Sequence, residues 1–285
     1  MTENAHHHQH HGGHENHDHA GLAEILNLDA QVLGSYLEDT TRWAAQLVGG
    51  TPATIVDAGA GSGAGTVALA KRFATANILA MDKSAQMLVH TLEAARVRGV
   101  EGRVSTVQAD LDEPWPQIAS SDLIWASSSL HEVSDPEQTM RQMFAGLNPG
   151  GLLIVVEMDA LPLFLPVELD DCGAPQPGLE SRLHAAVALQ EWNSYPEWSA
   201  GLERAGFELV DKRSFPSVSS AAPGLTARYA QTFFARFRQA LEKVVSADDL
   251  AALDRLLAAT GTESLAHRTD LQVRGSRTAW AARKP

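Results

Sequence analysis

Ile55-Val56-Asp57-Ala58-Gly59-Ala60-Gly61-Ser62-Gly63 is the stretch of sequence that decides the fold. Its first half belongs to a short apolar run that closes on an acidic residue, which predicts a buried strand. Its second half places a glycine at every other position, and glycine lets a backbone approach a ligand closely in conformations that a Cβ forbids. A helical pattern follows from Thr66 to Ala74. The segment therefore predicts a strand, a glycine-rich turn and a helix, with a ligand at the turn.

The same alternation continues along the chain. Further strands are predicted at 78–81, 103–108, 122–126 and 152–157, and helices at 84–98 and 135–147. The strands are apolar on both faces, which is typical of a parallel sheet covered by helices on both sides. We therefore predict an α/β, doubly wound, Rossmann-like fold with right-handed crossovers.

Helical patterns and a proline-rich segment flank this alternation. Residues 22–48 carry apolar side chains at helical spacing and predict two amphipathic helices. Residues 160–178 hold four prolines and predict an irregular segment. Beyond it we expect helices at 179–192 and 197–205, a strand at 207–213, a helical pair within 225–259 and a closing strand at 278–282.

The composition is that of a folded, acidic chain. Its 285 residues are 44% hydrophobic, enough for a full core. The 35 acidic side chains exceed the 22 basic ones, for a formal net charge of −13, which disfavours nucleic-acid binding. No apolar run approaches the roughly 20 residues that span a bilayer, and the polar N-terminus does not resemble a signal peptide. We therefore expect no membrane partner. Because the single cysteine, Cys172, cannot form an internal disulfide, we also expect a cytoplasmic protein.

The first 20 residues hold eight of the twelve histidines, interleaved with Gly, Asn, Glu and Asp. Such a segment has nothing to pack and predicts a disordered tail. An expression tag would also be rich in histidine, but interruptions such as Gln9, Gly12 and Gly13 favour a native tail. Its imidazoles could bind a divalent metal such as Zn²⁺ or Ni²⁺. We expect no catalytic metal there, because no folded scaffold fixes the ligand geometry.

Two carboxylates indicate which ligand the glycine turn accepts. Asp57 lies two residues before the first glycine, where it would repel a pyrophosphate but attract an ammonium or a sulfonium. Asp82 ends the next strand, 25 residues later, where a carboxylate can accept both hydroxyls of a ribose. The spacing also departs from the dinucleotide pattern G-x-G-x-x-G, because Ala64 stands at its last position. A helix-capping role is the alternative for both carboxylates.

Five segments, in this order, resemble the class I S-adenosylmethionine-dependent methyltransferases of the small-molecule branch, which includes quinone-biosynthesis enzymes. They are the glycine turn, Asp82, Gln108-Ala109-Asp110-Leu111, the strand 122–127 with Leu130-His131-Glu132-Val133, and Leu147-Asn148-Pro149-Gly150-Gly151. The resemblance covers residues 50–160 and, more loosely, the last strand. It implies a seven-stranded, mostly parallel sheet whose last strand is antiparallel. It also implies S-adenosylmethionine as cofactor and S-adenosylhomocysteine as product.

The resemblance further implies cofactor contacts, residue by residue. The methionine moiety would lie against Asp57, Gly59, Ala60 and Gly61; the ribose on Asp82; the adenine along Lys83 and Met87, with Asp110 and the Leu111 amide at its amino group; and Ala126 and Ser127 would complete the site. The helices before the core would form a lid carrying Tyr36 and Arg42. The arginine could pair with the methionine carboxylate, although a solvated helix face is the simpler interpretation.

We therefore divide the chain into a His-rich tail (1–20), a helical lid (21–50), a cofactor-binding core (51–160) and a last part (161–285). This last part would supply the acceptor-pocket helices and the last two strands. Ten of the seventeen aromatic residues lie within 160–240. Most, such as Phe233 and Phe237, fit a helical core stripe, whereas Trp192, Tyr195 and Trp198 flank a proline turn. These three are the expected pocket residues for an apolar or aromatic small molecule.

Methyl transfer from a sulfonium is an in-line displacement, in which alignment contributes most. A base is needed only where the acceptor must lose a proton. His131 is the expected base because its ordinary pKa lies near neutrality, with Glu132 and Asp159 as weaker alternatives. A histidine that merely packs below the cofactor would look the same in the sequence.

One departure narrows the acceptor. Methyltransferases that act on amino groups often carry Asn-Pro-Pro-aromatic after the fourth strand, whereas this chain has Ala126-Ser127-Ser128-Ser129. Methylation of adenine, cytosine or glutamine side chains is therefore disfavoured. Two other functions stay open at this stage: a non-catalytic protein that binds cofactor or metal through its tail, and a nicotinamide-dependent oxidoreductase, against which Asp57 argues.

Overall fold

The structure is a computed structural model that describes residues 15–167, 177–190, 196–219 and 221–285. Its centre is one seven-stranded sheet in the order β3-β2-β1-β4-β5-β7-β6. The strands are β1 (Thr54–Ala58), β2 (Asn77–Asp82), β3 (Val104–Gln108), β4 (Ser121–Ser127), β5 (Leu147–Met158), β6 (Glu208–Val218) and β7 (Arg274–Arg283). The predicted α/β fold is confirmed.

The sheet is parallel except at one strand. The pairs β1–β2, β1–β4, β2–β3 and β4–β5 are parallel, whereas β7 runs antiparallel to both β5 and β6. The antiparallel last strand implied by the resemblance is therefore confirmed. It is longer than the sequence pattern predicted. It pairs along the whole of β6 and with Leu152–Met158 of β5. The strand order reverses between β1 and β4, which is where ligands of open α/β sheets bind.

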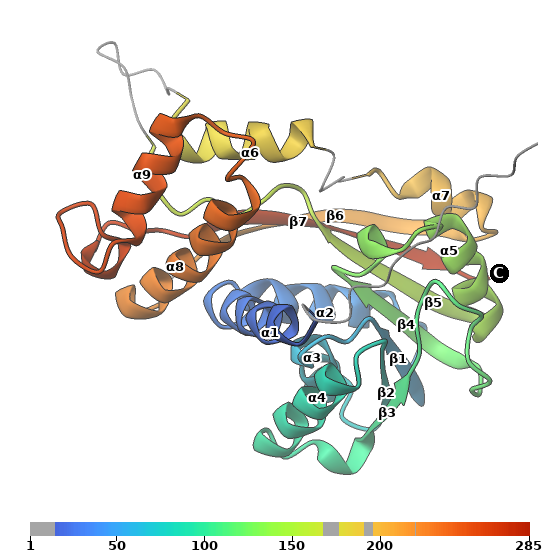
Figure 1. Cartoon of the computed structure of the whole chain (residues 1–285). Helices are drawn as coiled ribbons and strands as arrows, with labels where there is room; N and C mark the ends of the chain where they lie inside the picture. The colour runs from blue at the N-terminus through green and yellow to red at the C-terminus, as the bar shows by residue number, and fades with distance from the viewer. Residues whose placement is uncertain (1–14, 168–176, 191–195, 220) are drawn as a thin grey trace, which may run out of the picture.

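Helices cover both faces of the sheet (Figure 1). They are α1 (Glu15–Val32), α2 (Ser35–Leu47), α3 (Ala64–Arg72), α4 (Ala85–Val97), α5 (Pro136–Gly146), α6 (Leu179–Leu189), α7 (Ser199–Arg204), α8 (Pro223–Ala240) and α9 (Ala247–Leu257), with short 3₁₀ turns η1 (Glu101–Arg103), η2 (Leu130–Glu132) and η3 (Leu265–His267). In Figure 1, α6, α8 and α9 gather at one end of the molecule, and α5 and α7 lie at the other end beside the C-terminus.

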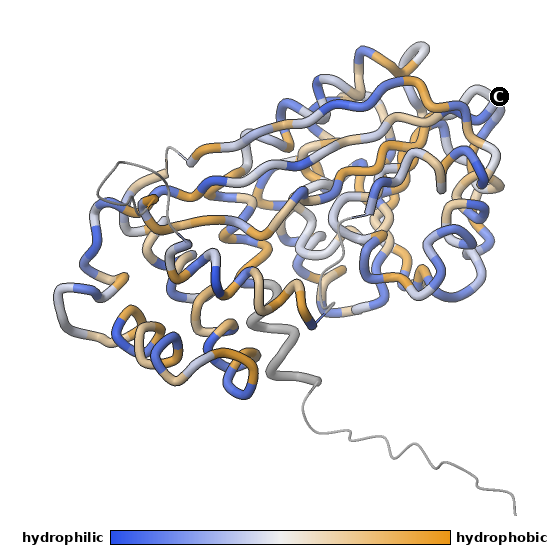
Figure 2. Tube along the Cα trace, turned by 90° about the horizontal axis from the view of Figure 1, so that it is seen from above, coloured by the Kyte–Doolittle hydropathy of each residue, from blue (hydrophilic) through white to orange (hydrophobic). Residues whose placement is uncertain are grey.

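Two hydrophobic cores hold these layers together, one on each face of the sheet. The larger core joins α1, α2 and α3 to α8 and α9, with Trp43, Leu69 and Phe234 among its most buried side chains. The smaller core joins the opposite face to α5 and α7 through Met143 and Leu202. Figure 2 shows hydrophobic and hydrophilic residues alternating along the helices, as expected for elements with one buried face.

Most of the other predicted elements lie within a few residues of the observed ones. Ser246 caps α9 as its spacing predicted, because its hydroxyl accepts a hydrogen bond from the amide of Asp249. The described part of 160–178 contains only an isolated bridge, between Leu163 and Arg274. The end of the helix predicted to reach 192, and residues 1–14 of the predicted His-rich tail, lie outside the described residues. Residues 15–20, predicted to be disordered, instead form the start of α1, so that part of the prediction is wrong. Among the residues described, no helix is long and apolar enough to cross a membrane.

The turn from β1 into α3 is packed too tightly for a side chain. Gly63, at the N-cap of α3, has a φ of +88°. A Cβ added there would lie 2.7 Å from the Cα of Thr91 on α4. This glycine is therefore required twice, for its backbone conformation and for the close approach of α4.

Replacing this glycine should cost more stability than replacing one that faces solvent. We expect Gly63→Ala to lower the free energy of unfolding by about 3 kcal/mol, from the left-handed conformation and overpacking together. Gly99→Ala is the matched control: its φ is +66°, but a Cβ there would meet nothing within 4 Å, so about 1 kcal/mol is expected. Urea unfolding of both variants measures the difference, and equal losses would contradict the packing argument.

Candidate functional site

The glycine turn lies against the turns that follow β2 and β4. The amides of Gly59 and Ala60 both donate to the Met81 carbonyl at 2.9 Å. A Cβ at Gly59 would lie 2.4 Å from the Cβ of Ser129, and the Ser129 hydroxyl donates to the Ala58 carbonyl at 2.9 Å. Glycine at this position therefore brings the ends of β1, β2 and β4 together at one edge of the sheet.

Asp82 links the second strand to this turn. Its Oδ2 accepts a hydrogen bond from the Gly61 amide at 2.9 Å, and its Oδ1 accepts one from the Ser84 amide at 2.8 Å. Ser84 in turn caps α4, because its hydroxyl accepts from the amide of Met87. Asp82 is half-buried. The structure thus joins the predicted ribose carboxylate to the predicted methionine loop, and also gives it the bond to a helix start that the capping alternative expected.

Asp57 is buried behind the turn. Its Oδ2 accepts a hydrogen bond from the Thr66 hydroxyl at 2.5 Å, in the first turn of α3. Burial raises the pKa of Asp57 to about 7, although the hydrogen bond from Thr66 opposes that rise. The contacts that the structure gives Asp57 are therefore those of a carboxylate at a helix start. Its expected contact with the cofactor stays a prediction.

The residues predicted beside the adenine lie around the same edge. Met87 is buried, and Leu111 lies near Gly59, because its Cδ1 would be 3.8 Å from a Cβ added there. Asp110 is half-buried, and its Oδ1 accepts from the Asp112 amide at 3.1 Å. Lys83 is exposed and close enough to Glu132 to lower the pKa of that carboxyl, although the bond from His131 lowers it more. The structure brings these predicted residues to one edge of the sheet.

The turn after β4 is sharply bent. Ala126 is fully buried, Ser127 is half-buried, and Ser128 has a φ of +53°, a conformation that residues other than glycine seldom adopt. The Ser128 amide donates to the Val156 carbonyl at 2.8 Å. This bend directs the chain into η2 and places His131 above the end of β5.

His131 is held by a buried carboxylate. Its Nδ1 lies 2.7 Å from Oε2 of Glu157, and its Nε2 lies 3.3 Å from Oε1 of the exposed Glu132. The other oxygen of Glu157 accepts from the amides of Ser129 and Leu130 at 3.1 and 3.0 Å. Glu157 is only 4% exposed. It therefore fixes both the ring and the backbone of the turn.

This environment favours the protonated ring. Burial lowers the pKa of His131, but the hydrogen bonds with Glu132 and Glu157 outweigh it and raise that pKa to about 10. At neutral pH the ring is therefore an imidazolium, which has no free lone pair to accept a proton. Of the two weaker alternatives for the base, Glu132 pairs with this ring. Asp159 is exposed and directly follows the end of β5.

Tyr36 lies in a second buried cluster. The Arg277 guanidinium of β7 stacks 3.8 Å from the centre of the Tyr36 ring and donates to Asp29 of α1 at 2.6 Å. The Tyr229 hydroxyl of α8 donates to the same carboxylate at 2.8 Å. Burial raises the pKa of Tyr36, and a hydrogen bond with the Ser127 side chain opposes that rise. The cluster therefore joins α1 and α2 to β7 and α8, and Tyr36 also joins α2 to the end of β4.

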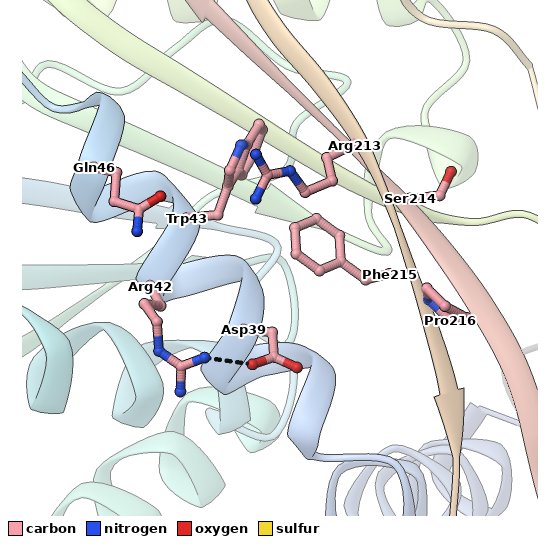
Figure 3. Close-up of a pocket in the computed structure, with 8 residues that line it drawn as sticks. All are labelled: Asp39, Arg42, Trp43, Gln46, Arg213, Ser214, Phe215 and Pro216. Carbon is pink, nitrogen blue, oxygen red and sulfur yellow. Dashed lines mark hydrogen bonds and ion pairs between the residues drawn. The ribbon is translucent and has the colours of Figure 1, made fainter.

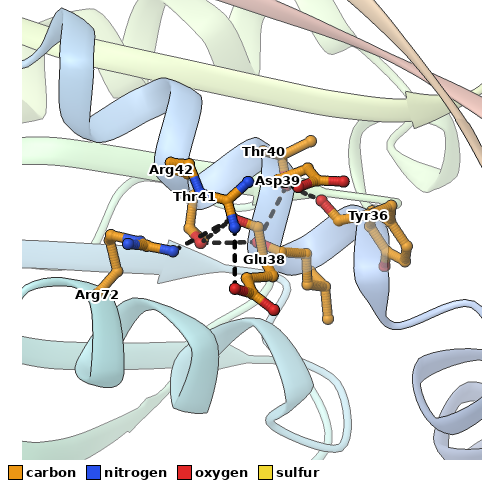
Figure 4. A network of polar contacts seen from close by, with 8 residues as sticks. Tyr36, Glu38, Asp39, Thr40, Thr41, Arg42 and Arg72 are labelled. Carbon is orange, nitrogen blue, oxygen red and sulfur yellow. Dashed lines mark hydrogen bonds and ion pairs between the residues drawn. The ribbon is translucent and has the colours of Figure 1, made fainter.

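Arg42 points away from this cluster. It pairs with Glu38 at 2.9 Å and Asp39 at 2.7 Å on its own helix (Figure 4). It also lines a shallow pocket with Arg213 and Phe215 of β6 (Figure 3). No contact in the described part of the chain joins it to the glycine turn. The solvated helix face is the arrangement that the structure shows.

The aromatic residues of the last part are mostly core. Phe164, Tyr229, Phe233 and Phe234 stack with ring centres 4.9 to 6.4 Å apart. Trp198, an expected pocket residue, is instead buried in the smaller core beside α5 and α7. That expectation was wrong. The Trp198 ring belongs to a hydrophobic core that includes residues of the sheet, and the sequence alone does not show this packing. Trp192 and Tyr195 lie outside the described residues.

Two site residues were missed from the sequence. Glu157 ends an apolar run, so a carboxylate at a strand tip was a signal of the same kind as Asp57 and Asp82. Arg277 begins the last strand, and its partner Asp29 lies 248 positions earlier in the chain. No local pattern joins two residues so far apart.

We expect His131 to stay protonated from pH 5.5 to 8.5. In an NMR titration its ring resonance should not shift over this range, and the loss of that resonance in His131→Asn identifies it. Because its pKa is raised above the ordinary 6.5, the pair stabilises the fold below about pH 6.5 and that contribution is lost as pH rises toward 10. Glu157→Gln should lower the free energy of unfolding by about 2 kcal/mol at pH 6 and by less at pH 10. Glu132→Gln, at an exposed carboxyl, should cost little. A ring that titrates near 6.5 in the parent protein would contradict this pairing.

Known proteins share this arrangement. A family described as a methyltransferase domain matches residues 56–153. The 27-O-demethylrifamycin SV methyltransferase of Amycolatopsis mediterranei is 30% identical over 238 residues, which cover 81% of this chain and 82% of that protein. A trans-aconitate 2-methyltransferase of Variovorax paradoxus is 37% identical over 135 residues, 46% of this chain and 50% of that protein. The chain thus spans about half the length of these trans-aconitate enzymes.

A solved structure supports the same fold. A protein from Bacillus halodurans C-125, described as a candidate methyltransferase, superposes with a TM-score of 0.55 at 17% identity and covers 86% of this chain and 98% of its own. It shares the α/β sheet architecture. With a relative matched over most of both lengths, and the glycine turn, Asp82 and strand order in place, the chain belongs to the class I S-adenosylmethionine-dependent methyltransferases.

Proposed function

We propose that this protein transfers a methyl group from S-adenosylmethionine to a small organic molecule. The observation that carries the proposal is the bond between Asp82 and the Gly61 amide, which joins the carboxylate predicted to bind the ribose to the glycine turn at the switch point of the sheet. The family uses this cofactor, and the residues fit it. The other two functions raised by the sequence, a nicotinamide enzyme and a non-catalytic metal protein, gain nothing from the comparisons.

The turn residues would hold the cofactor. Gly59 and Gly61, with φ of +78° and +54°, leave the backbone open for close approach. Asp82 would give up its bond to Gly61 and accept the ribose hydroxyls, while Met87 and Leu111 would supply apolar contacts beside the adenine. When bound, the cofactor supplies an activated methyl group on a sulfonium. The chain's own task is then to align the acceptor with that group.

Proton removal is not assigned to His131 in this proposal. Its imidazolium, held by Glu157, would position the turn after β4. Asp57 is buried behind the turn with its Oδ2 bonded to the Thr66 hydroxyl, and this proposal gives it no proton-transfer role either. We therefore infer an acceptor atom that is nucleophilic without a protein base, or that ionises readily in solution.

The lid would control access to this site. A Cβ at Gly61 would lie 3.3 Å from the Leu26 side chain of α1, so α1 covers the turn. Tyr36 of α2 reaches Ser127 at the end of β4. We propose that α1 and α2 move to admit the cofactor and then place Tyr36 against it. Arg42 has no part in this proposal.

The acceptor would be a small organic molecule. The relatives are named for acceptors of low molecular weight, a rifamycin and trans-aconitate. The net charge of −13 speaks against a nucleic-acid acceptor. The single cysteine fits a reducing compartment, and we place the reaction in the cytoplasm.

Calorimetric titration with S-adenosylhomocysteine tests the cofactor. We expect micromolar binding to the parent protein and a loss of at least thirty-fold in Asp82→Ala, because two hydrogen bonds to a charged group are removed. Asp82→Asn should fall between them. Asp248→Ala, an exposed acid in the first turn of α9, is the control that should bind like the parent. Absence of binding to the parent would sink the proposed function.

A further inference from the structure

A cavity of about 520 Å³ lies between the lid and the core, on the α3 side of the glycine turn. Four helices contribute to it: α1 and α2 from the lid, and α3 and α4 from the core. Its charged lining residues are Glu38, Lys71, Arg72 and Arg98. None of these belongs to the predicted cofactor contacts. The volume lies within the range of small-molecule pockets.

The charge of this cavity opposes that of the protein. Three cations and one carboxylate line it, in a chain whose formal net charge is −13. Glu38 is paired with Arg42, which does not line the cavity. The side chains of Lys71 and Arg98 have no hydrogen bond or ion pair with any residue that the structure describes. Their charge is therefore available to a ligand.

Arg72 differs from the other two cations, because one donor of its guanidinium is buried without a partner among the described residues. Its Nε is buried and has no partner, and its one hydrogen bond runs from Nη2 to the Glu38 carbonyl at 3.4 Å (Figure 4). A guanidinium has five N–H donors in a fork that matches an oxyanion. Arg103 shows the contrast, because it donates to three carbonyls at the end of α3 at 2.6 to 3.1 Å. Arg72 thus retains donor capacity at the cavity wall.

The remaining wall mixes apolar and polar side chains. Leu37, Val67 and Ala68 line it together with Gln31 and Thr41. We propose that this cavity binds a small oxyanion with a short apolar body, a phosphate monoester or a carboxylate. The anion would lie among Lys71, Arg72 and Arg98, and the apolar body against Leu37 and Val67. The three cations are not among the predicted cofactor contacts, so this inference does not rest on the proposed function, although Ser62 and Gly63 of the glycine turn also line the cavity.

Titration calorimetry of the full chain with phenyl phosphate, and separately with benzoate, tests the site and distinguishes the two head groups. We expect saturable binding of at least one of them with a Kd below about 1 mM, retained in the presence of saturating S-adenosylhomocysteine. Lys71→Ala/Arg98→Ala should weaken that binding at least ten-fold. Neither side chain has a partner in the described structure, so the variant should unfold at the temperature of the parent protein. Arg72→Gln should weaken binding independently.

The control is Lys243→Ala, which removes an exposed cation between α8 and α9 and should leave the affinity unchanged. Three results would overturn the proposal: no saturable binding of either probe, displacement of the probe by S-adenosylhomocysteine, or equal affinity in the parent and the double variant. Binding of S-adenosylhomocysteine itself is measured in the same samples. Its loss would count against the proposed function and not against this site.

Discussion

The close approach of three strand ends at the glycine turn is the constraint on which the rest of the structure depends. The Met81 carbonyl accepts from two successive amides of the turn, and Ser129 packs where a side chain at Gly59 would stand. The turn therefore sets the distances among β1, β2 and β4. The carboxylates at these strand tips share one edge of the sheet because the strands are parallel, and the missing side chain at Gly59 lets the turn after β4 pack against that edge.

Much of the fold and the nearest part of the site could be predicted from the sequence, for a physical reason. Parallel strands that are buried on both faces leave continuous apolar runs, and each run here ends near its polar tip residue. Asp57 and Asp82 could be found because an acidic residue that closes an apolar run is a local pattern, and glycines follow Asp57 as well. The antiparallel last strand came from the family resemblance, since a short apolar run alone does not show direction.

The rest of the site depends on contacts between residues distant in sequence. Glu157 fixes His131 across 26 positions, and Arg277 meets Asp29 across 248. Nothing near His131 in the sequence indicates that a buried carboxylate would stabilise its protonated form. The prediction that Trp198 lines the acceptor pocket was wrong for a related reason, because an aromatic residue in the sequence can belong to a pocket wall or to a core. A local pattern gives the type of residue, whereas packing decides its environment.

The charges at the site suit the chemistry of a cationic cofactor. Asp57, Asp82, Glu132 and Glu157 gather at the carboxyl edge, and His131 is the cation held among them. A sulfonium and an ammonium would meet an excess of carboxylates there, which favours their binding. In methyl transfer the positive charge of the sulfonium is dispersed. Carboxylates that are already held by hydrogen bonds and ion pairs need little rearrangement during the reaction. A base with a near-neutral pKa would add nothing to an acceptor that is already nucleophilic. The paired histidine is therefore consistent with catalysis by alignment, in which the fixed turn after β4 matters more than proton transfer.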